Sequence, residues 1–157
     1  MHCTGCGKAM LSQMPTEQVE AIIRKHGLPP ITQNTITDHD QLMEALATYR
    51  RKGYALDNEE ETMGVKCVAM AIRTGRGDVA GAISISGPAI SITPEVVDQY
   101  SDLLARACNT LTQCAHLAAL TKEAKARMHV NSVKGCLAIL NGTEWPDVVW
   151  SICTFEF

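Results

Sequence analysis

The spacing of apolar residues indicates helices in the first third of the chain. Leu42, Leu46 and Tyr49 recur every three or four residues, which places them on one face of a helix. Asp38, with Gln41 three residues later, is typical of a helix start, and the glycine after Lys52 is typical of a helix end. The pattern predicts this helix, and similar reasoning predicts helices over residues 8–14, 15–27 and 94–113, the last of which could extend over residues 114–127.

The apolar spacing then changes to the period of a β-strand. Short strands are expected over residues 54–57, 65–73 and 79–86, with the last two joined by a turn into a hairpin. In the last strand, isoleucine alternates with Ser84 and Ser86, so the two hydroxyls should share one face. Gly87-Pro88 should end this strand, and no regular element is evident over residues 129–157.

Composition and charge narrow the class of protein. A chain of 157 residues with 46% hydrophobic content can bury one core, and the 4% aromatic share predicts aliphatic packing. The net charge of -3 gives no general attraction for phosphate backbones. No apolar run reaches membrane-spanning length and no signal peptide is evident, so we expect a cytoplasmic protein.

The Cys3-Thr4-Gly5-Cys6 motif, with His2 beside it, matches half of a zinc site or a redox pair. Zinc needs about four ligands, usually from two such motifs, and the sequence has no second one. Close packing at a helix start is therefore the favoured interpretation, and no metal or other cofactor is expected. The seven cysteines are an odd number, which suits thiols in a reducing compartment better than disulfides.

The acidic run at residues 57–61 offers carboxylates for metal binding or acid–base chemistry, although a solvated loop is the commoner role of such a run. Asp57 is the exception, because a carboxylate at a strand end can point into a pocket. Cys67 lies within an apolar strand, where it is either a buried small residue or part of a site. The chain has no catalytic triad pattern, phosphate-binding glycine loop or H-E-x-x-H motif, so we expect no enzyme.

Three motifs occur in an order that identifies a family resemblance. They are residues 53–60 (GYALDNEE), 64–69 (GVKCVA) and 83–88 (ISISGP). Together they resemble the C-terminal domain of IclR-type transcription regulators. Three further segments extend the similarity across residues 1–113: the glycine-lysine helix start at 7–11, the loop at 34–37, and the helix start Thr93-Pro94.

The resemblance implies an α/β (α+β) fold of the GAF-like type, in which an antiparallel sheet flanked by helices encloses a small-molecule pocket. Residues 1–113 would form a partial effector-binding domain, and residues 114–157 a C-terminal extension of unknown structure. In the family, a DNA-binding domain, a linker helix and the first strands of the effector domain precede the point where this chain begins. We therefore expect a domain that is incomplete at its N-terminus and has an exposed sheet edge.

The resemblance also implies a ligand and partners. The effector would be a small carboxylate, the chain would form homo-oligomers, and DNA would be bound only through a winged helix-turn-helix domain absent from this chain. A non-functional remnant and a thiol-based redox protein are the alternatives. Carried over by position, the effector-binding residues are Gly5, Cys6, Asp57, Cys67, Ser84 and Ser86.

Overall fold

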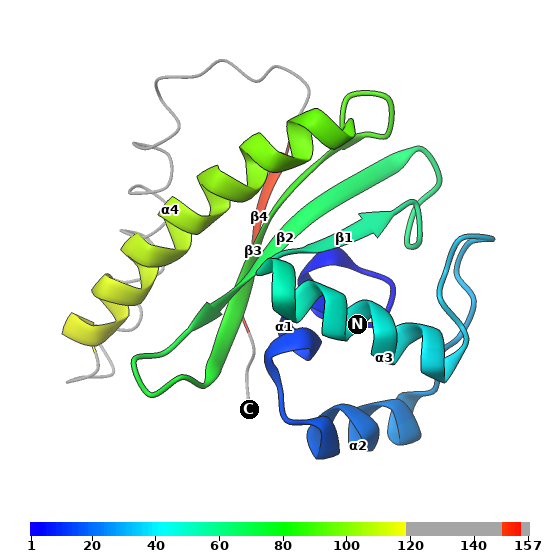
Figure 1. Cartoon of the computed structure of the whole chain (residues 1–157), viewed down its shortest axis with the longest axis horizontal. Helices are drawn as coiled ribbons and strands as arrows, with labels where there is room; N and C mark the ends of the chain where they lie inside the picture. Colours follow the sequence, from blue (N-terminus) through cyan, green and yellow to red (C-terminus); the bar gives the residue numbers. More distant parts are fainter. Residues whose placement is uncertain (119–148, 155–157) are drawn as a thin grey trace.

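The computed structural model describes residues 1–118 and 149–154, with side chains described through residue 110. A four-stranded sheet separates three helices on one side from one long helix on the other (Figure 1). The elements are α1 (Gly5–Gln13), α2 (Thr16–His26), α3 (His39–Lys52), β1 (Ala55–Asn58), β2 (Val65–Arg73), β3 (Val79–Pro88), α4 (Pro94–Ala118) and β4 (Val149–Thr154).

The sheet is antiparallel throughout, in the order β1-β2-β3-β4. The predicted hairpin is confirmed, since β2 pairs with β3 along its whole length, with a bulge between Ile72 and Arg73. The predicted end of this strand is wrong by two residues, because Gly87 and Pro88 still pair with Lys66 and Val65. Proline cannot donate a hydrogen bond to the ladder, and Pro88 forms the terminal pair of the ladder with Val65.

β4 corrects the expectation that residues 129–157 hold no regular element. Its residues pair with β3 from Gly81↔Thr154 to Ser86↔Val149. The local pattern was not sufficient to predict the strand, because its hydrogen-bonding partner lies far away in sequence. Residues 129–148 and 155–157 fall outside the described part of the chain.

Successive side chains of β3 point to opposite faces of the sheet, and each face has its own hydrophobic core. Ile83 and Ile85 pack with Val68 against α4, where Tyr100 and Leu104 are also buried. The opposite face of the sheet carries small residues, which let α1 come close to the strands. The core on this α1 side includes Ala9, Leu11, Ala55, Cys67, Ala69 and Ala82.

The helix ends test the predicted boundaries. Asp38 Oδ1 accepts a hydrogen bond from the Gln41 amide at 2.8 Å, and Gly53 follows α3 in the left-handed conformation with φ 82°, so both predicted ends of this helix are confirmed. By contrast, α1 begins at Gly5 rather than at residue 8. The helix α4 continues past residue 113 to Ala118, an extension that the sequence had left open.

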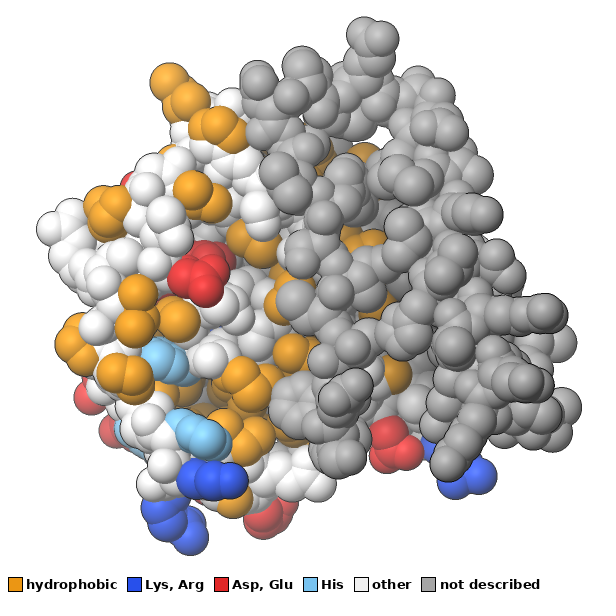
Figure 2. Space-filling model, turned by 180° about the vertical axis from the view of Figure 1, so that it is seen from behind, with side chains coloured by type: hydrophobic (Ala, Val, Ile, Leu, Met, Phe, Trp, Pro, Cys, Tyr) orange, Lys and Arg blue, Asp and Glu red, His pale blue; other side chains and the backbone are white. Residues whose placement is uncertain are grey.

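Two properties of the described residues concern a membrane-spanning helix and a basic surface. None of their helices is long and apolar enough to cross a membrane. The back of the molecule shows hydrophobic, acidic and basic side chains side by side, without one continuous basic area among the coloured residues (Figure 2). This face therefore does not resemble a surface that binds a phosphate backbone.

Candidate functional site

The N-terminus of α1 forms one wall of the candidate site. Thr4 caps the helix, since its Oγ1 accepts from the Gly7 amide at 3.0 Å. Gly5 and Cys6, the first two helical residues, are buried. A Cβ on Gly5 would lie 2.7 Å from the Cys67 Sγ, so only glycine allows the helix to approach the sheet this closely. The first amides of a helix have no partners within the helix, and they attract negative charge.

The sheet brings the other predicted residues onto a single face. Asp57 lies directly opposite Cys67 on β2, and Cys67 lies opposite Ser86 on β3, so the three form one row across the strands. Ser84 belongs to the neighbouring row, opposite Ala69. Because paired residues of an antiparallel sheet point to the same side, all four share the face that α1 covers. Figure 1 shows α1 against these strands.

The burial of these four residues differs. Ser84, Asp57 and Cys67 are 2%, 5% and 7% exposed, whereas Ser86 is half-buried. Ser86 is therefore the most accessible of the four side chains. A serine hydroxyl at this position can donate a hydrogen bond to a ligand and can also accept one.

Asp57 has a structural role that the sequence interpretation did not include. Its Oδ1 accepts a hydrogen bond from the Glu60 amide at 2.8 Å, which closes the loop after β1. Burial raises the pKa of the Asp57 carboxyl above its ordinary value, against the opposing effects of this hydrogen bond and of Lys8. At least one carboxylate oxygen is therefore committed to the protein rather than to a pocket.

The acidic run contains a buried residue, which corrects its description as a solvated loop. Glu60 is only 4% exposed, and its carboxylate forms an ion pair with Lys8 of α1, whose side chain is fully buried. The Lys8 ammonium also lies 5.4 Å from the centre of the Tyr49 ring. Burial, together with the nearby charges of Glu60 and Asp57, raises the pKa of Tyr49 to about 12.

Two threonines fix the backbone of the same loop. Thr35 Oγ1 donates to the Glu60 carbonyl at 2.6 Å, and Thr32 Oγ1 donates to the Glu59 carbonyl at 2.7 Å. The loop after β1 is therefore held by side chains from α1 and from the 32–35 turn. Its position is determined by these contacts, although its composition suggested a solvated loop.

A signal for the Lys8–Glu60 pair exists in the sequence. Residues 5–12 contain small or apolar side chains almost throughout, and the structure buries every one of them. A helix with no polar face is usually buried on all sides. A lysine within such a helix needs a carboxylate partner, because an unpaired buried charge is very costly. The acidic run at residues 57–61 was the obvious source of that partner.

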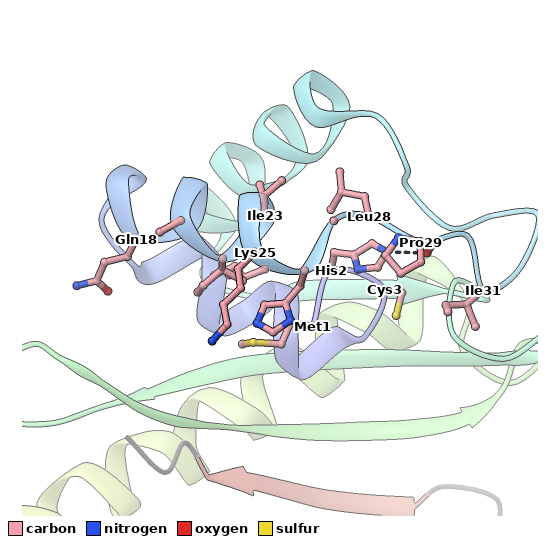
Figure 3. A pocket seen from close by; sticks show the side chains of 14 residues that line it. Met1, His2, Cys3, Gln18, Ile23, Lys25, Leu28, Pro29 and Ile31 are labelled. Atoms are coloured by element: carbon pink, nitrogen blue, oxygen red, sulfur yellow. Dashed lines mark hydrogen bonds between the residues drawn. The ribbon is translucent and has the colours of Figure 1, made fainter.

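A cavity among the described residues lies elsewhere. It measures about 790 Å³ and lies between the first residues of the chain, α2 and the segment that follows it (Figure 3). None of the six predicted residues lines it, nor do any line a smaller cavity of about 90 Å³ between α1, α2 and α3. The side chains that Figure 3 labels around it are those of Met1, His2, Cys3, Gln18, Ile23, Lys25, Leu28, Pro29 and Ile31.

The residues of the Cys-x-x-Cys motif have packing roles. The described cysteines Cys3, Cys6, Cys67 and Cys108 are buried and none is joined in a disulfide. His2 Nε2 lies 3.1 Å from the Pro29 carbonyl and hydrogen-bonds to it. Among residues whose side chains are described, no three histidine, cysteine or acidic side chains cluster as metal ligands.

The fold is a mixed α/β domain, with Ser84, Ser86 and the N-terminus of α1 on one face of its antiparallel sheet. The chain matches the family described as "Bacterial transcriptional regulator IclR C-terminal" over residues 1–113. It therefore belongs to the IclR family, as the three sequence motifs predicted.

Curated relatives are regulators of transcription. The chain is 37% identical over 112 residues to the transcriptional repressor IclR of Escherichia coli K12, and 42% identical over 95 residues to the repressor AllR of Klebsiella pneumoniae. The first match covers 71% of this chain and 41% of the relative; the second covers 60% and 35%. The chain thus spans less than half the length of these relatives, which are regulators and not enzymes.

Solved structures of the same family confirm the fold class. IclR of Thermotoga maritima has a TM-score of 0.70 and 33% identity, and the match covers 73% of this chain and 46% of that one. The PobR inducer-binding domain from Acinetobacter, a double mutant in complex with 3-hydroxybenzoic acid, has a TM-score of 0.66 and 31% identity, with coverage of 71% and 66%.

Proposed function

We propose that residues 1–113 bind a small carboxylate metabolite and so sense it for an IclR-type transcription regulator. The observation that carries this proposal is the convergence of Ser84, Ser86 and the N-terminus of α1 on one face of the sheet. These groups come from distant parts of the chain, and all of them can donate hydrogen bonds.

The chemistry of these donors suits a carboxylate. The helix start at Gly5 and Cys6 supplies amides and the positive end of a helix dipole. The hydroxyls of Ser84 and Ser86 would donate to the carboxylate oxygens, and Cys67, which is paired opposite Ser86, would form the floor. Asp57 would border the site while it holds the loop after β1. The PobR domain in complex with 3-hydroxybenzoic acid is a structural neighbour whose ligand carries a carboxyl group.

In the complete regulator, effector binding would change how a separate winged helix-turn-helix domain holds operator DNA. That domain would lie outside these 157 residues, and self-association of the sensing domains would bring two DNA-binding domains together. Residues 114–157 would then form an extension to the family domain, part of which, β4, pairs with the sheet.

A redox function receives less support from the described cysteines. A reactive thiol needs a lowered pKa and solvent access. Burial instead raises the pKa of the Cys3 thiol, and Cys6, its partner in the motif, is 6% exposed. Both properties favour a packing role for the motif.

A thermal-shift screen tests the proposed function. The compounds are glyoxylate, pyruvate, sugar acids and aromatic acids, each paired with its uncharged amide. A ligand that binds only the folded state raises the unfolding midpoint, because it stabilises that state by an amount that grows with the logarithm of its concentration relative to Kd. We expect at least one acid to raise the midpoint while its amide does not. If no acid shifts the midpoint of a sample that unfolds cooperatively, the proposed function is wrong.

A further inference from the structure

The buried Lys8–Glu60 pair connects the two walls of the candidate site. Lys8 lies in the first turn of α1, where its amide donates to the Thr4 carbonyl at 2.9 Å, directly before Gly5. On the other side, the Glu60 amide donates to the Asp57 carboxylate at 2.8 Å. The Lys8 backbone thus bonds to the residue before Gly5, and the Glu60 backbone bonds to Asp57. Each member of the pair is therefore attached to one wall of the site.

A buried ion pair such as this one adds little to the free energy of unfolding. Removing two charges from water costs free energy that their attraction often fails to recover, and an apolar pair of similar size is frequently as stable. Glu60 Oε2 is buried with no hydrogen-bond partner among the described residues, which adds to this cost. Because burial of this ion pair costs free energy, we explain its presence by the positions in which it holds α1 and the loop after β1.

The contacts around the pair restrict that geometry. The Lys8 ammonium lies over the Tyr49 ring of α3, while Thr35 holds the Glu60 carbonyl from the other side. The pair is thus contacted by two segments besides its own, α3 and the 32–35 turn. Neither Lys8 nor Glu60 can change position without moving the start of α1 or the end of β1.

We propose that Lys8 and Glu60 are positioning residues, which hold the N-terminus of α1 and Asp57 at the separation that the effector requires. This inference rests on the proposed function. The ion pair would not touch the effector; it would act through the helix start on one side and through the Asp57 loop on the other. Its loss would loosen the contact between Gly5 and Cys67, because that contact depends on how closely α1 approaches β2.

The test uses the whole chain and the double variant Lys8→Met/Glu60→Leu, which replaces both charges with apolar side chains. The first measurement is the Kd for the acid found in the screen, by isothermal titration calorimetry. We expect Kd to rise by about tenfold or more, by analogy with the groups that orient metal ligands, whose loss weakens metal binding on this scale. An unchanged Kd in a folded double variant would overturn the inference.

A matched control distinguishes a displaced helix α1 from a general loss of fold stability. Ile92→Val removes one methylene from the core on the α4 side, where Ile92 is 3% exposed, and should leave Kd unchanged although it destabilises the fold. If the double variant fails to unfold cooperatively, Lys8→Met/Glu60→Gln replaces it, because glutamine keeps the shape of Glu60 and no unpaired charge is left buried. For this second double variant the same rise in Kd supports the inference, and an unchanged Kd overturns it.

A second measurement needs no effector. The rate of Cys67 alkylation by iodoacetamide, located by mass spectrometry, reports how tightly α1 covers β2. We expect faster alkylation of Cys67 in the charge-free variant, with no change at Cys108 on the α4 side. If no acid binds the unaltered chain, the proposed function fails by itself. The Cys67 rate then decides the structural part of the inference, and an unchanged rate overturns it.

Discussion

Asp57 accepts a hydrogen bond at 2.8 Å from the amide of Glu60, three residues further along the chain. The same aspartate lies opposite Cys67, which in turn lies opposite Ser86. Its carboxylate therefore joins the loop after β1 to the candidate site. This relationship makes Asp57 both a structural residue and a candidate binding residue, and variants must separate the two roles.

Asp57→Ala should lower the free energy of unfolding by about 1–3 kcal/mol, because the buried Glu60 amide loses its acceptor. Asp57→Asn keeps an acceptor oxygen and should cost less. Urea denaturation of the two variants at neutral pH measures the difference. Equal losses of unfolding free energy in the alanine and asparagine variants would show that the hydrogen bond from the Glu60 amide does not contribute to stability.

The pH dependence of stability provides a second test of Asp57. Burial raises its pKa in the folded state, so the folded protein holds this proton more tightly than the unfolded chain does. The contribution of Asp57 to stability should therefore decline as pH rises from its ordinary value of 3.8 through the raised one. Unfolding free energies of the unaltered chain minus those of Asp57→Asn should fall over that range. If this free-energy difference grew with pH, the pKa of Asp57 would be lowered by folding rather than raised.

Gly5→Ala should destabilise the protein by about 1–3 kcal/mol, the usual cost of overpacking, because the new Cβ would lie 2.7 Å from the Cys67 Sγ. A second change, Cys67→Ala, removes that sulfur. The double variant Gly5→Ala/Cys67→Ala should thus lose less stability than the sum of the two single variants. Chemical denaturation of all four proteins completes the cycle, and simple additivity would argue against a direct contact.

His39 should make stability depend on pH near neutrality. Its ring lies 2.9 Å from Glu20 of α2 and 3.0 Å from Asp40 of α3, and these carboxylates raise the pKa of His39 above its ordinary 6.5. The resulting stabilisation is fully present below 6.5 and is lost as pH rises through the raised value. Thermal midpoints of the unaltered chain and of His39→Asn, measured as a function of pH, should converge on the alkaline side. Parallel curves would exclude this interaction.

A chain that ends at residue 148 lacks β4 and should associate through the exposed edge of β3. The segment Gly81–Ser86 would lose its pairing with Val149–Thr154, and an open edge is a template for another strand. Sedimentation velocity at several concentrations should show larger species for the shortened chain than for the full chain. Identical profiles would mean that β4 does not protect this edge.

The parts of the fold that follow local rules were predictable. The Asp38 cap and the alternation of Ile83, Ser84, Ile85 and Ser86 depend only on neighbouring residues, and the structure shows both as expected. These patterns also placed the two serines on a common face. The motif order then identified the family, which the match over residues 1–113 shows.

The features missed were those that depend on distant partners. Glu60 is buried because Lys8, far away in sequence, needs a counter-charge, so the composition of the acidic run was misleading. β4 is a strand because the edge of β3 offers it hydrogen bonds. The roles of Gly5, Cys6, Cys67, Ser84 and Ser86 in binding a ligand stay predictions, although the structure brings these residues to one side of the sheet.

The most direct test of the central claim is a calorimetric titration of the acid identified by the screen into three proteins. These are the unaltered chain, Ser84→Ala/Ser86→Ala, and Ser101→Ala, whose hydroxyl donates to Asp98 on α4, away from the site. Losing hydrogen bonds to a charged ligand costs about 1.5–3 kcal/mol each, so Kd for the double serine variant should rise by at least about tenfold. The Ser101 variant should bind as the unaltered chain does. Equal Kd values for all three proteins would contradict a carboxylate site on this face of the sheet.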